Sequence, residues 1–594
     1  MITDRLQNLR AKMKDHGISA LILPTSDFHD TEYVCDYFGA RKHFSGFTGS
    51  AGVLVVLPDK AGLWTDGRYF IQAARQLEGS GIDLMKMGMP GTPEIKDCII
   101  EALNEGDKAA FDGRCVSMQD FEGYQKTFKD HGIDVVTDLD LAGEAWPDRP
   151  ALPASETFHY DEKYAGKSVK DKLAEVRKAM KEAGAKHHVI SKIDEVAWLY
   201  NLRAHDIPSF PVALAYTILD EDGGMLYIND KRLDEVSRRI LEENNIAIKG
   251  YDAVYDDVKA LEGPVLMEKD FINSRIGRSV NEPVWADDPI QLLKACKNPV
   301  EVEGFREAHR RDAVAMIRFW KWLEEEMAAG HEVTELSAKK KLTSLRAEQP
   351  EYVEDSFETI AAYGPNAAMA HYQPDEAHPV KLENKGFFLV DSGGHYLPGT
   401  TDITRTFVMG DLTDEERAGF TDVLRGHINL TKAVFMKGGR GMNLDILARE
   451  PLWAKGMDYN HGTGHGVGCL LSVHEGPNGF RWKIVPERKD SCVLEEGMVT
   501  SDEPGLYEEG KFGIRHENLL VVQPAFSSEY GDFLKHDVLT LVPFDVRGLD
   551  LALMSPEEID WLNAYHKRVY DTIAPRLTAE EADWLAEKSA PISK

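Results

Sequence analysis

The chain has 594 residues and carries 69 Lys and Arg against 100 Asp and Glu, a formal charge of −31. Its length exceeds what one hydrophobic core normally holds, and 43% apolar with 28% charged residues is typical of folded domains rather than disordered or fibrous chains. The acidic excess, with no stripe rich in Lys and Arg, excludes nucleic acid as a partner, and no apolar run reaches the roughly 18 residues of a membrane span.

The first residues and the cysteines predict a cytoplasmic protein. Residues Met1–Gly17 have the pattern of a charged amphipathic helix rather than the apolar core of a signal peptide. The six cysteines are scattered and include no Cys-x-x-Cys pair, which suits a reducing compartment. We therefore expect free, mostly buried thiols.

A weak internal repeat relates Arg5–Pro24 to Lys172–Ser191. Each copy has apolar residues at helical spacing, then Gly17 or Gly184, which can end the helix, and then a more apolar stretch. The repeat predicts two related α/β domains in tandem. Three prolines in Glu144–Thr157 place the boundary there, and a Pro-rich loop inside one domain is the alternative.

A third region begins at Lys297–Glu301, where Asn298 is a candidate N-cap, Pro299 the first helical residue and Glu301 its capping partner. A helix with a core-facing apolar stripe follows, made of Ala313, Met316, Ile317, Trp320, Leu323 and Met327. The predicted domains are therefore 1–155, 156–298 and 299–594, with a C-terminal extension from about 535.

Short strand-like runs follow the long helix and alternate with Gly-rich turns and helices, which predicts an α+β domain. These runs are Ser356–Ala362, Gly386–Asp391, Asp402–Met409, Met498–Asp502 and Ile514–Val522. Two of them flank a turn rich in Gly and Pro, so Asp391 and Asp402 should lie close together across a hairpin-like pair. Two such carboxylates repel unless they are protonated or bridged by a cation; turn-stabilising aspartates are the alternative.

Three histidines, His461, His465 and His474, lie in or near a segment in which every second residue is Gly. Such a segment makes a poor helix, so we expect a strand whose backbone closely approaches a ligand or another strand. Any one histidine alone is more often a core or surface residue than a ligand. Glu503 and Glu517 each stand at the edge of an apolar run, where an ordinary exposed carboxylate is the simple alternative.

The two aspartates, one of the histidines and the two glutamates are more informative together than any one of them alone. Asp391, Asp402, His465, Glu503 and Glu517 offer four carboxylates and one imidazole, and two divalent cations would cancel the charge of the carboxylates. Oxygen-rich ligation with a single nitrogen favours Mn²⁺, Co²⁺, Fe²⁺ or Zn²⁺ and excludes a thiolate site of structural zinc. Two carboxylate-bridged metals generate a hydroxide near neutral pH, which predicts a hydrolase.

The order of these five residues resembles the metal-ligand pattern of the pita-bread metallopeptidases, which include methionine aminopeptidase, prolidase and aminopeptidase P. Within them, the chain is similar to the long, three-domain, cytosolic type of Xaa-Pro aminopeptidase (aminopeptidase P), over nearly its whole length. The segments that carry this resemblance besides the ligands are Ser45–Gly52, Leu63–Phe70, Tyr363–Ala368 with His371 and Tyr372, Leu539–Pro543 and Asp560–His566.

The resemblance implies a fold of two tandem creatinase-like α/β domains followed by a pita-bread catalytic domain. It implies that Asp391 binds one metal, that Asp402 and Glu517 bridge both, and that His465 and Glu503 complete the other site. The further residues to which it assigns roles are His371 and His474 (substrate and oxyanion), His461 (substrate cleft) and Arg68 (peptide contact). Arg515 is expected to hydrogen-bond a ligand carboxylate, and His516, a departure from the family pattern, should point away from the metals.

The activity that the resemblance implies is metal-dependent removal of the N-terminal residue from peptides with proline at position two. In the mechanism that the resemblance implies, a dimetal-bridging hydroxide would attack the bond before proline, His474 would stabilise the oxyanion and Glu503 would carry the proton to the leaving nitrogen. Two divalent ions are expected, Mn²⁺ in first place with Co²⁺ or Zn²⁺ as alternatives, in a homodimer. The rival interpretations are a prolidase-type X-Pro dipeptidase, methionine aminopeptidase, creatinase and a non-catalytic peptide-binding protein.

Overall fold

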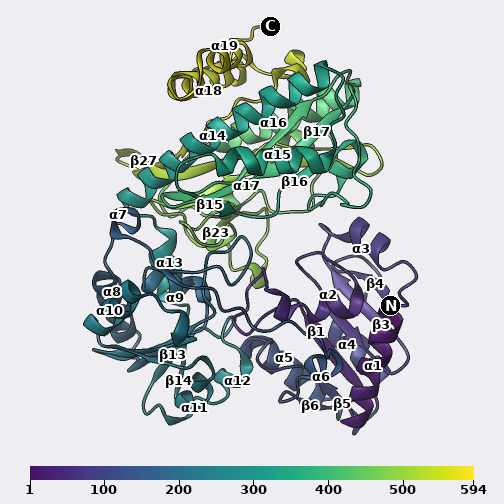
Figure 1. Ribbon diagram of the computed structural model, residues 1–594, viewed down its shortest axis with the longest axis vertical. Helices are drawn as coiled ribbons and strands as arrows, with labels where there is room; N and C mark the ends of the chain where they lie inside the picture. The colour runs from purple at the N-terminus through teal and green to yellow at the C-terminus, as the bar shows by residue number, and fades with distance from the viewer. The chain divides into compact units, whose positions relative to one another are not determined.

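The computed structural model describes residues 1–594, apart from the side chain of Glu487, and the chain divides into two compact units (Figure 1). The first unit comprises Met1–Glu162 and Lys167–Ile290, and the second comprises Lys163–Gly166 and Gln291–Lys594. The first unit holds the predicted domain 1–155 and most of the predicted domain 156–298, whose residues 163–166 and 291–298 belong to the second unit. The boundary between the two N-terminal domains stays a prediction. Within the described residues, no helix combines the length and the apolar character needed to cross a bilayer.

The first unit contains two six-stranded sheets with the same topology. The first sheet has the order β4-β3-β2-β1-β5-β6 and consists of β1 (Ala20–Pro24), β2 (Val53–Val56), β3 (Ala61–Thr65), β4 (Asp83–Lys86), β5 (Lys108–Ala110) and β6 (Asp134–Val136). The second has the order β12-β11-β10-β8-β13-β14 and consists of β8 (His187–Ile190), β10 (Tyr216–Leu219), β11 (Gly224–Tyr227), β12 (Ile246–Lys249), β13 (Val265–Met267) and β14 (Pro283–Trp285).

Corresponding strands of the two sheets also run in corresponding directions. β1 pairs antiparallel with β2 and parallel with β5, and β8 pairs antiparallel with β10 and parallel with β13. The repeat seen in the sequence is therefore a repeat of fold, and the expected pair of related α/β domains is confirmed.

Each repeated sheet begins with the predicted helix–glycine–strand unit. Helix α1 (Ile2–Asp15) precedes β1, and α8 (Val169–Glu182) precedes β8. The matching apolar residues are buried: Leu6, Leu9 and Met13 in α1, and Leu173, Val176 and Met180 in α8. Gly17 and Gly184 follow the two helices with φ of 65° and 71°, a backbone region that residues with a side chain rarely adopt.

The other helices of the first unit and the segment between its halves are also defined. These helices include α2 (Ala40–Ser45), α3 (Phe70–Gln76), α4 (Ile95–Ala102), α5 (Met118–Lys129), α6 (Leu141–Ala145), α9 (Ile193–Leu199), α10 (Glu235–Glu243), α11 (Val254–Asp257) and α12 (Ser274–Gly277). Residues 146–157 form neither helix nor strand, as the prolines of that segment predict, before the two-residue strand β7 (Phe158–His159), which pairs with β9 (Leu202–Arg203).

The second unit begins with the long helix that the sequence predicts. α14 (Pro299–Ala328) has Asn298 as N-cap, whose side chain accepts from the backbone N–H groups of Val300 and Glu301, while Glu301 caps Asn298 in return. Its apolar stripe lies in the main core of the unit, with Met327 at the margin. The capping signal and the stripe therefore predicted both the start of this helix and its buried face.

Three larger sheets and one two-stranded sheet follow in the second unit, and α15 (Glu335–Ala347), α16 (Asp414–Thr431) and α17 (Gly441–Trp453) pack against them (Figure 1). The orders of the three larger sheets are β15-β18-β19, β16-β17-β20 and β21-β28-β27-β24-β22-β23. The strands are β15 (Tyr352–Asp355), β16 (Ile360–Tyr363), β17 (Phe387–Ser392), β18 (Gly394–Tyr396), β19 (Gly399–Thr400), β20 (Ile403–Val408), β21 (Val434–Met436), β22 (Gly464–Gly466), β23 (Glu475–Phe480), β24 (Val499–Asp502), β27 (Asn518–Ser528) and β28 (Gly531–Val538).

Two predicted strands are wrong in their bounds. The run Ser356–Ala362 forms a strand only from Ile360, where β16 begins, and residues 356–359 connect β15 to β16. The run Ile514–Val522 is not a single strand, because β26 (Phe512–Arg515) ends in a two-stranded sheet with β25 (Gly505–Glu508), and β27 begins only at Asn518 in the six-stranded sheet. Glu517 lies at this change of sheet, where its N–H donates to the carbonyl of Thr404 at 3.2 Å. Apolar periodicity cannot detect such a break, since β26 and the first five residues of β27 are all buried.

The C-terminal helices α18 (Pro556–Ile573) and α19 (Ala579–Lys588) lie at one end of the second unit, drawn in yellow in Figure 1. The rings of Trp320 in α14 and Trp584 in α19 meet edge to face at 5.4 Å, so the C-terminal segment shares the main core. The six cysteines form no disulfide among the described residues. Three of them, Cys35, Cys98 and Cys469, are buried, fewer than expected.

Candidate metal centre

The five predicted ligands come together where two sheets of the second unit meet. Asp391 lies in β17, Asp402 directly precedes β20, His465 is the middle residue of β22, Glu503 directly follows β24, and Glu517 lies between β26 and β27. Thr404 of β20 joins the sheets, since its carbonyl accepts from Glu517 N–H and its Oγ1 donates to Glu517 Oε2 at 2.6 Å. We call these five residues the carboxylate cluster.

The side chains of the carboxylate cluster face one another. Asp402, His465 and Glu517 present ligand atoms that all lie within 4.8 Å of one another. His465 Nε2 is 3.4 Å from Asp402 Oδ2 and 3.4 Å from Glu503 Oε1. The buried Oδ1 of Asp391 has no hydrogen-bond partner among the described residues, which leaves it available to a cation.

Burial and mutual repulsion shift the proton affinities of the carboxylate cluster. Burial, together with the nearby charge of Asp391, raises the pKa of Asp402 to about 6. Burial also raises the pKa of Glu503, and burial with the neighbouring aspartates raises that of Glu517 well above its ordinary value. Burial alone would lower the pKa of His465, but Asp402 and Glu503 raise it to about 9. Without a cation, the group therefore holds protons that divalent metal ions would replace.

The glycines beside His465 allow close contact between strands, as expected. A Cβ atom at Gly464 would lie 1.8 Å from the carbonyl oxygen of Ser501 in β24, and one at Gly466 would lie 2.2 Å from that of Glu475 in β23. Residues with a side chain at these positions would force the three strands apart. The Gly-rich segment thus holds His465 between β23 and β24.

Arg515 donates to a carboxylate of the cluster, the hydrogen bond expected of it. Its Nη2 donates to Asp391 Oδ2 at 2.6 Å, its Nε to Thr404 Oγ1 at 3.2 Å and its Nη1 to Tyr507 Oη at 2.7 Å. Tyr507 Oη in turn lies 2.8 Å from His461 Nε2. A chain of polar contacts therefore runs from Asp391 through Arg515 and Tyr507 to His461.

The structure places the other predicted histidines at different distances from the cluster. His474 is half-buried, and its ring centroid lies 4.3 Å from that of His465. His461 is held neutral, because burial and Arg515 lower its pKa to about 3. His371 is half-buried and follows Ala370, whose carbonyl accepts from Arg515 Nη2 at 3.4 Å.

Two further predicted residues lie apart from this group of contacts. His516 lies between β26 and β27, where it is buried between the rings of Phe420 and Phe544 at centroid distances of 4.3 and 5.5 Å, so it faces the core, as expected. Arg68 belongs to the first unit, where its guanidinium donates to both oxygens of Asp66 at 2.9 and 2.8 Å.

Several polar residues around the cluster were not predicted from the sequence. Ser501 Oγ accepts from His465 N–H at 2.9 Å and donates to Glu503 Oε1 at 3.3 Å. Tyr507 and Thr404 were missed in the same way. Thr404 is the one with a visible signal, since it stands two residues after Asp402 in a predicted strand and therefore on the same face.

Comparison with known protein families agrees with this architecture. The model of metallopeptidase family M24 matches residues 303–524, and the model of its C-terminal region matches 532–592. Two models of the creatinase/prolidase N-terminal domain match residues 5–140 and 148–301. Fold and matches together define the class: a metallopeptidase in which a pita-bread domain follows two creatinase-like domains.

Relatives that match this chain over its whole length identify a smaller group within this class. The probable Xaa-Pro aminopeptidase P of Laccaria bicolor is 38% identical over 99% of this chain and 94% of its own, and Xaa-Pro aminopeptidase 1 of Dictyostelium discoideum is 36% identical over 100% and 97%. The crystal structure of the X-prolyl aminopeptidase from Caenorhabditis elegans, described as a cytosolic enzyme with a di-nuclear active site, is 35% identical, with a TM-score of 0.96 and full coverage of both chains. The chain belongs to the Xaa-Pro aminopeptidase P group of metallopeptidase family M24.

Proposed function

We propose that this chain is a metal-dependent aminopeptidase that removes the N-terminal residue from peptides with proline at the second position. The carboxylate cluster is the observation that carries the proposal, because it supplies a buried set of oxygen ligands and one imidazole in the M24 domain. The full-length relatives named Xaa-Pro aminopeptidase support the choice of substrate. The fold shared with the di-nuclear enzyme of Caenorhabditis elegans supports two metal ions.

The ligand set fits two divalent cations. We assign Asp391 to one ion, Asp402 and Glu517 to both, and His465 and Glu503 to the other. Oxygen-rich donors with one nitrogen suit Mn²⁺, with Co²⁺ or Zn²⁺ as alternatives. When bound, such ions offset the carboxylate charges and lower the pKa of a water molecule toward neutrality.

The protein's own residues would bind the peptide and move its protons. Glu503, whose pKa burial raises, would carry a proton to the leaving nitrogen, and Ser501 orients its carboxyl. His474 and His371 would hold the substrate carbonyl as negative charge develops on its oxygen. His461, kept neutral, would line the substrate cleft.

The chemistry of proline explains why a dedicated enzyme is needed. The bond before proline is a tertiary amide without an N–H group, so an aminopeptidase that requires that donor fails on it. The selectivity must come from contacts to the ring and to the residues around it. We keep Arg68 as a candidate contact for the peptide.

Loss of the Tyr507 hydroxyl is expected to lower kcat. In Tyr507→Phe, Arg515 loses the acceptor at 2.7 Å and His461 loses its contact at 2.8 Å, so both side chains are less well oriented. Groups that orient metal ligands typically contribute about 10–100-fold to activity or affinity, and we expect a decrease of that size. Steady-state kinetics with Arg-Pro-Pro measures it.

Tyr352→Phe is the matched control for that variant, since it removes a hydroxyl that donates to Asp355 at 2.8 Å and contacts neither Arg515 nor His461. Its kcat should stay near that of the wild type. Equal losses in both variants would show that the Tyr507 hydroxyl has no special role.

The substrate panel Arg-Pro-Pro, Arg-Pro and Arg-Ala-Ala tests the proposed function. Release of the N-terminal residue is measured on chelator-stripped protein to which Mn²⁺, Co²⁺ or Zn²⁺ is added. Cleavage of Arg-Pro-Pro but not Arg-Ala-Ala is the expected result. Cleavage of Arg-Pro alone would identify a prolidase-type dipeptidase, and no cleavage with any metal would support a peptide-binding protein.

The proposal extends to assembly and location. The family resemblance suggests a homodimer, which sedimentation equilibrium of the full chain would test. The relative from Caenorhabditis elegans is described as cytosolic, and we propose the same location for this protein.

A further inference from the structure

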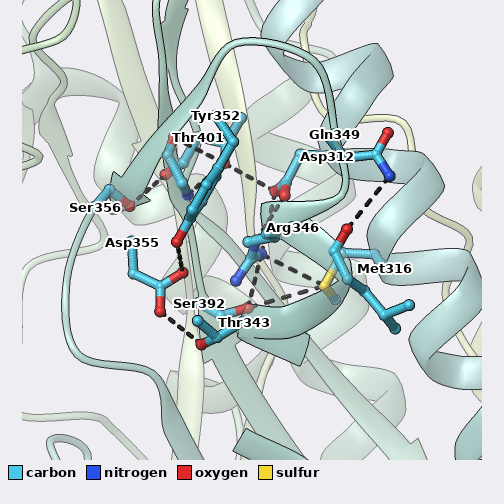
Figure 2. Close-up of polar contacts among 12 residues, drawn as sticks. Asp312, Met316, Thr343, Arg346, Gln349, Tyr352, Asp355, Ser356, Ser392 and Thr401 are labelled. Carbon is cyan, nitrogen blue, oxygen red and sulfur yellow. Dashed lines mark hydrogen bonds and ion pairs between the residues drawn. The ribbon is translucent and has the colours of Figure 1, made fainter. Parts of the chain in front are cut away.

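A buried ion pair joins helices α14 and α15 (Figure 2). Asp312 of α14 and Arg346 of α15 are both fully buried. Arg346 donates from Nε to Asp312 Oδ1 at 2.6 Å and from Nη2 to Asp312 Oδ2 at 3.1 Å. Tyr396 of β18 donates its hydroxyl to the same carboxylate at 2.9 Å.

Each member of the pair also binds a residue adjacent to a candidate ligand. Arg346 Nη2 donates to Ser392 Oγ at 3.0 Å, and Ser392 directly follows Asp391. Thr401 Oγ1 donates to Asp312 Oδ2 at 2.8 Å, and Thr401 directly precedes Asp402. Successive side chains of a strand point to opposite faces. The hydrogen bond that fixes the side chain of Ser392 therefore also fixes the direction of the Asp391 side chain.

Further hydrogen bonds fix both the side chain and the backbone of Thr401. Its Oγ1 accepts from Gly394 N–H at 2.9 Å, its N–H donates to the carbonyl of Gly394 at 2.9 Å, and its carbonyl accepts from Ser356 Oγ at 2.8 Å. Figure 2 shows Thr401 and Ser392 joined through Asp312 and Arg346. The backbone at both aspartates is thus tied to two helices through one buried ion pair.

We propose that Asp312 and Arg346 are positioning residues that hold Asp391 and Asp402 in the geometry required for metal binding. This inference rests on the proposed function, because the metals are those of the carboxylate cluster. Carboxylates this close repel one another and would move apart unless their strands were fixed. Supports of this kind typically change metal affinity by about 10–100-fold when they are removed.

An ion pair retained only for stability would give a different result. A buried pair can often be replaced without loss of stability, so its presence alone is weak evidence for a stabilising role. Metal affinity distinguishes the two interpretations, because a substitution that only destabilises the fold would not selectively weaken metal binding.

Thr401→Val tests the proposal, because it keeps the shape of the side chain but removes the hydroxyl bound to Asp312. Binding of Mn²⁺ to the chelator-stripped full chain is measured from the free-ion signal in electron paramagnetic resonance, and unfolding of the metal-free protein is measured by heating. We expect the Kd for Mn²⁺ to rise about tenfold or more. Thr401→Ser, which keeps the hydroxyl, should restore a Kd within about twofold of the wild type.

Thr343→Val is the matched control, since its hydroxyl donates to Asp355 at 2.6 Å on the outer side of the same group of contacts (Figure 2). It should lower the unfolding temperature as Thr401→Val does but leave the Kd for Mn²⁺ unchanged. Ser392→Ala provides a second variant if Thr401→Val does not fold, and it should also weaken Mn²⁺ binding.

Three outcomes would overturn the inference. Wild-type Kd values in both Thr401→Val and Ser392→Ala, or an equal loss of affinity in Thr343→Val, would show that the pair does not position the aspartates. A wild-type protein that binds neither Mn²⁺, Co²⁺ nor Zn²⁺ would overturn the proposed function and this inference with it. Binding by the wild type with unchanged variants would overturn this inference alone.

Discussion

Asp402→Asn is expected to lower kcat/KM for Arg-Pro-Pro by at least about 10³-fold, because metal ions in such sites supply several kcal/mol of transition-state stabilisation. The substitution removes one charged oxygen from a group whose other ligand atoms lie within 4.8 Å of it. Bound metal, measured by elemental analysis after dialysis, should fall below that of the wild type. Steady-state kinetics gives the loss in rate.

The same variant should be more stable than the wild type when both are metal-free. Asp402 is buried beside Asp391, and the pKa of its carboxyl is raised to about 6, so its charge destabilises the folded protein near neutral pH. Asp411→Asn, at an exposed position, is the control and should change neither activity nor metal content. Asp402→Asn with activity close to that of the wild type would rule out Asp402 as a ligand.

The second large effect is the pH dependence of stabilisation by metal. Between its ordinary pKa of 3.8 and about 6, Asp402 is protonated in the folded metal-free chain but ionised in the unfolded chain. The free energy of unfolding therefore falls as pH rises through that window. For His465, raised from 6.5 to about 9, the stabilisation is present below 6.5 and is lost as pH rises through 9.

Metal ions replace these protons, so they should stabilise the protein more at high pH than at low pH. We expect saturating Mn²⁺ to raise Tm more at pH 8 than at pH 5.5 and to restore the activity that a chelator abolishes. Thermal unfolding with and without Mn²⁺ at both pH values measures the difference. An equal or smaller shift at pH 8 would contradict ligation by the deprotonated cluster.

Local signals in the sequence predicted much of the fold. The cap at Asn298 marks the start of α14, and the repeat around Gly17 and Gly184 marks two sheets of identical topology. These features depend on residues that are neighbours in the chain, where helix caps and apolar periodicity act. The break between β26 and β27 was missed, because it arises from pairing with distant strands.

Sequence patterns predicted only part of the candidate site, because they detect contacts between residues that are close in the chain. Asp391 and Asp402 lie at adjacent ends of the antiparallel neighbours β17 and β20, so their proximity follows from pairing close in the sequence, whereas bringing His465, Glu503 and Glu517 to them depends on how two sheets meet. The resemblance to a family supplied that part. Neither source predicted the contacts of Arg346 with Asp312 and Ser392, which join residues far apart in the sequence.

The most direct test of the account is a titration of the chelator-stripped full chain with Mn²⁺, in which bound ions and the hydrolysis of Arg-Pro-Pro are measured in the same samples. We expect two ions bound per chain and hydrolysis that rises as they bind. Asp402→Asn should lose both the metal and the activity. Hydrolysis that persists without metal, or two ions bound with no hydrolysis of Arg-Pro-Pro, would contradict this account.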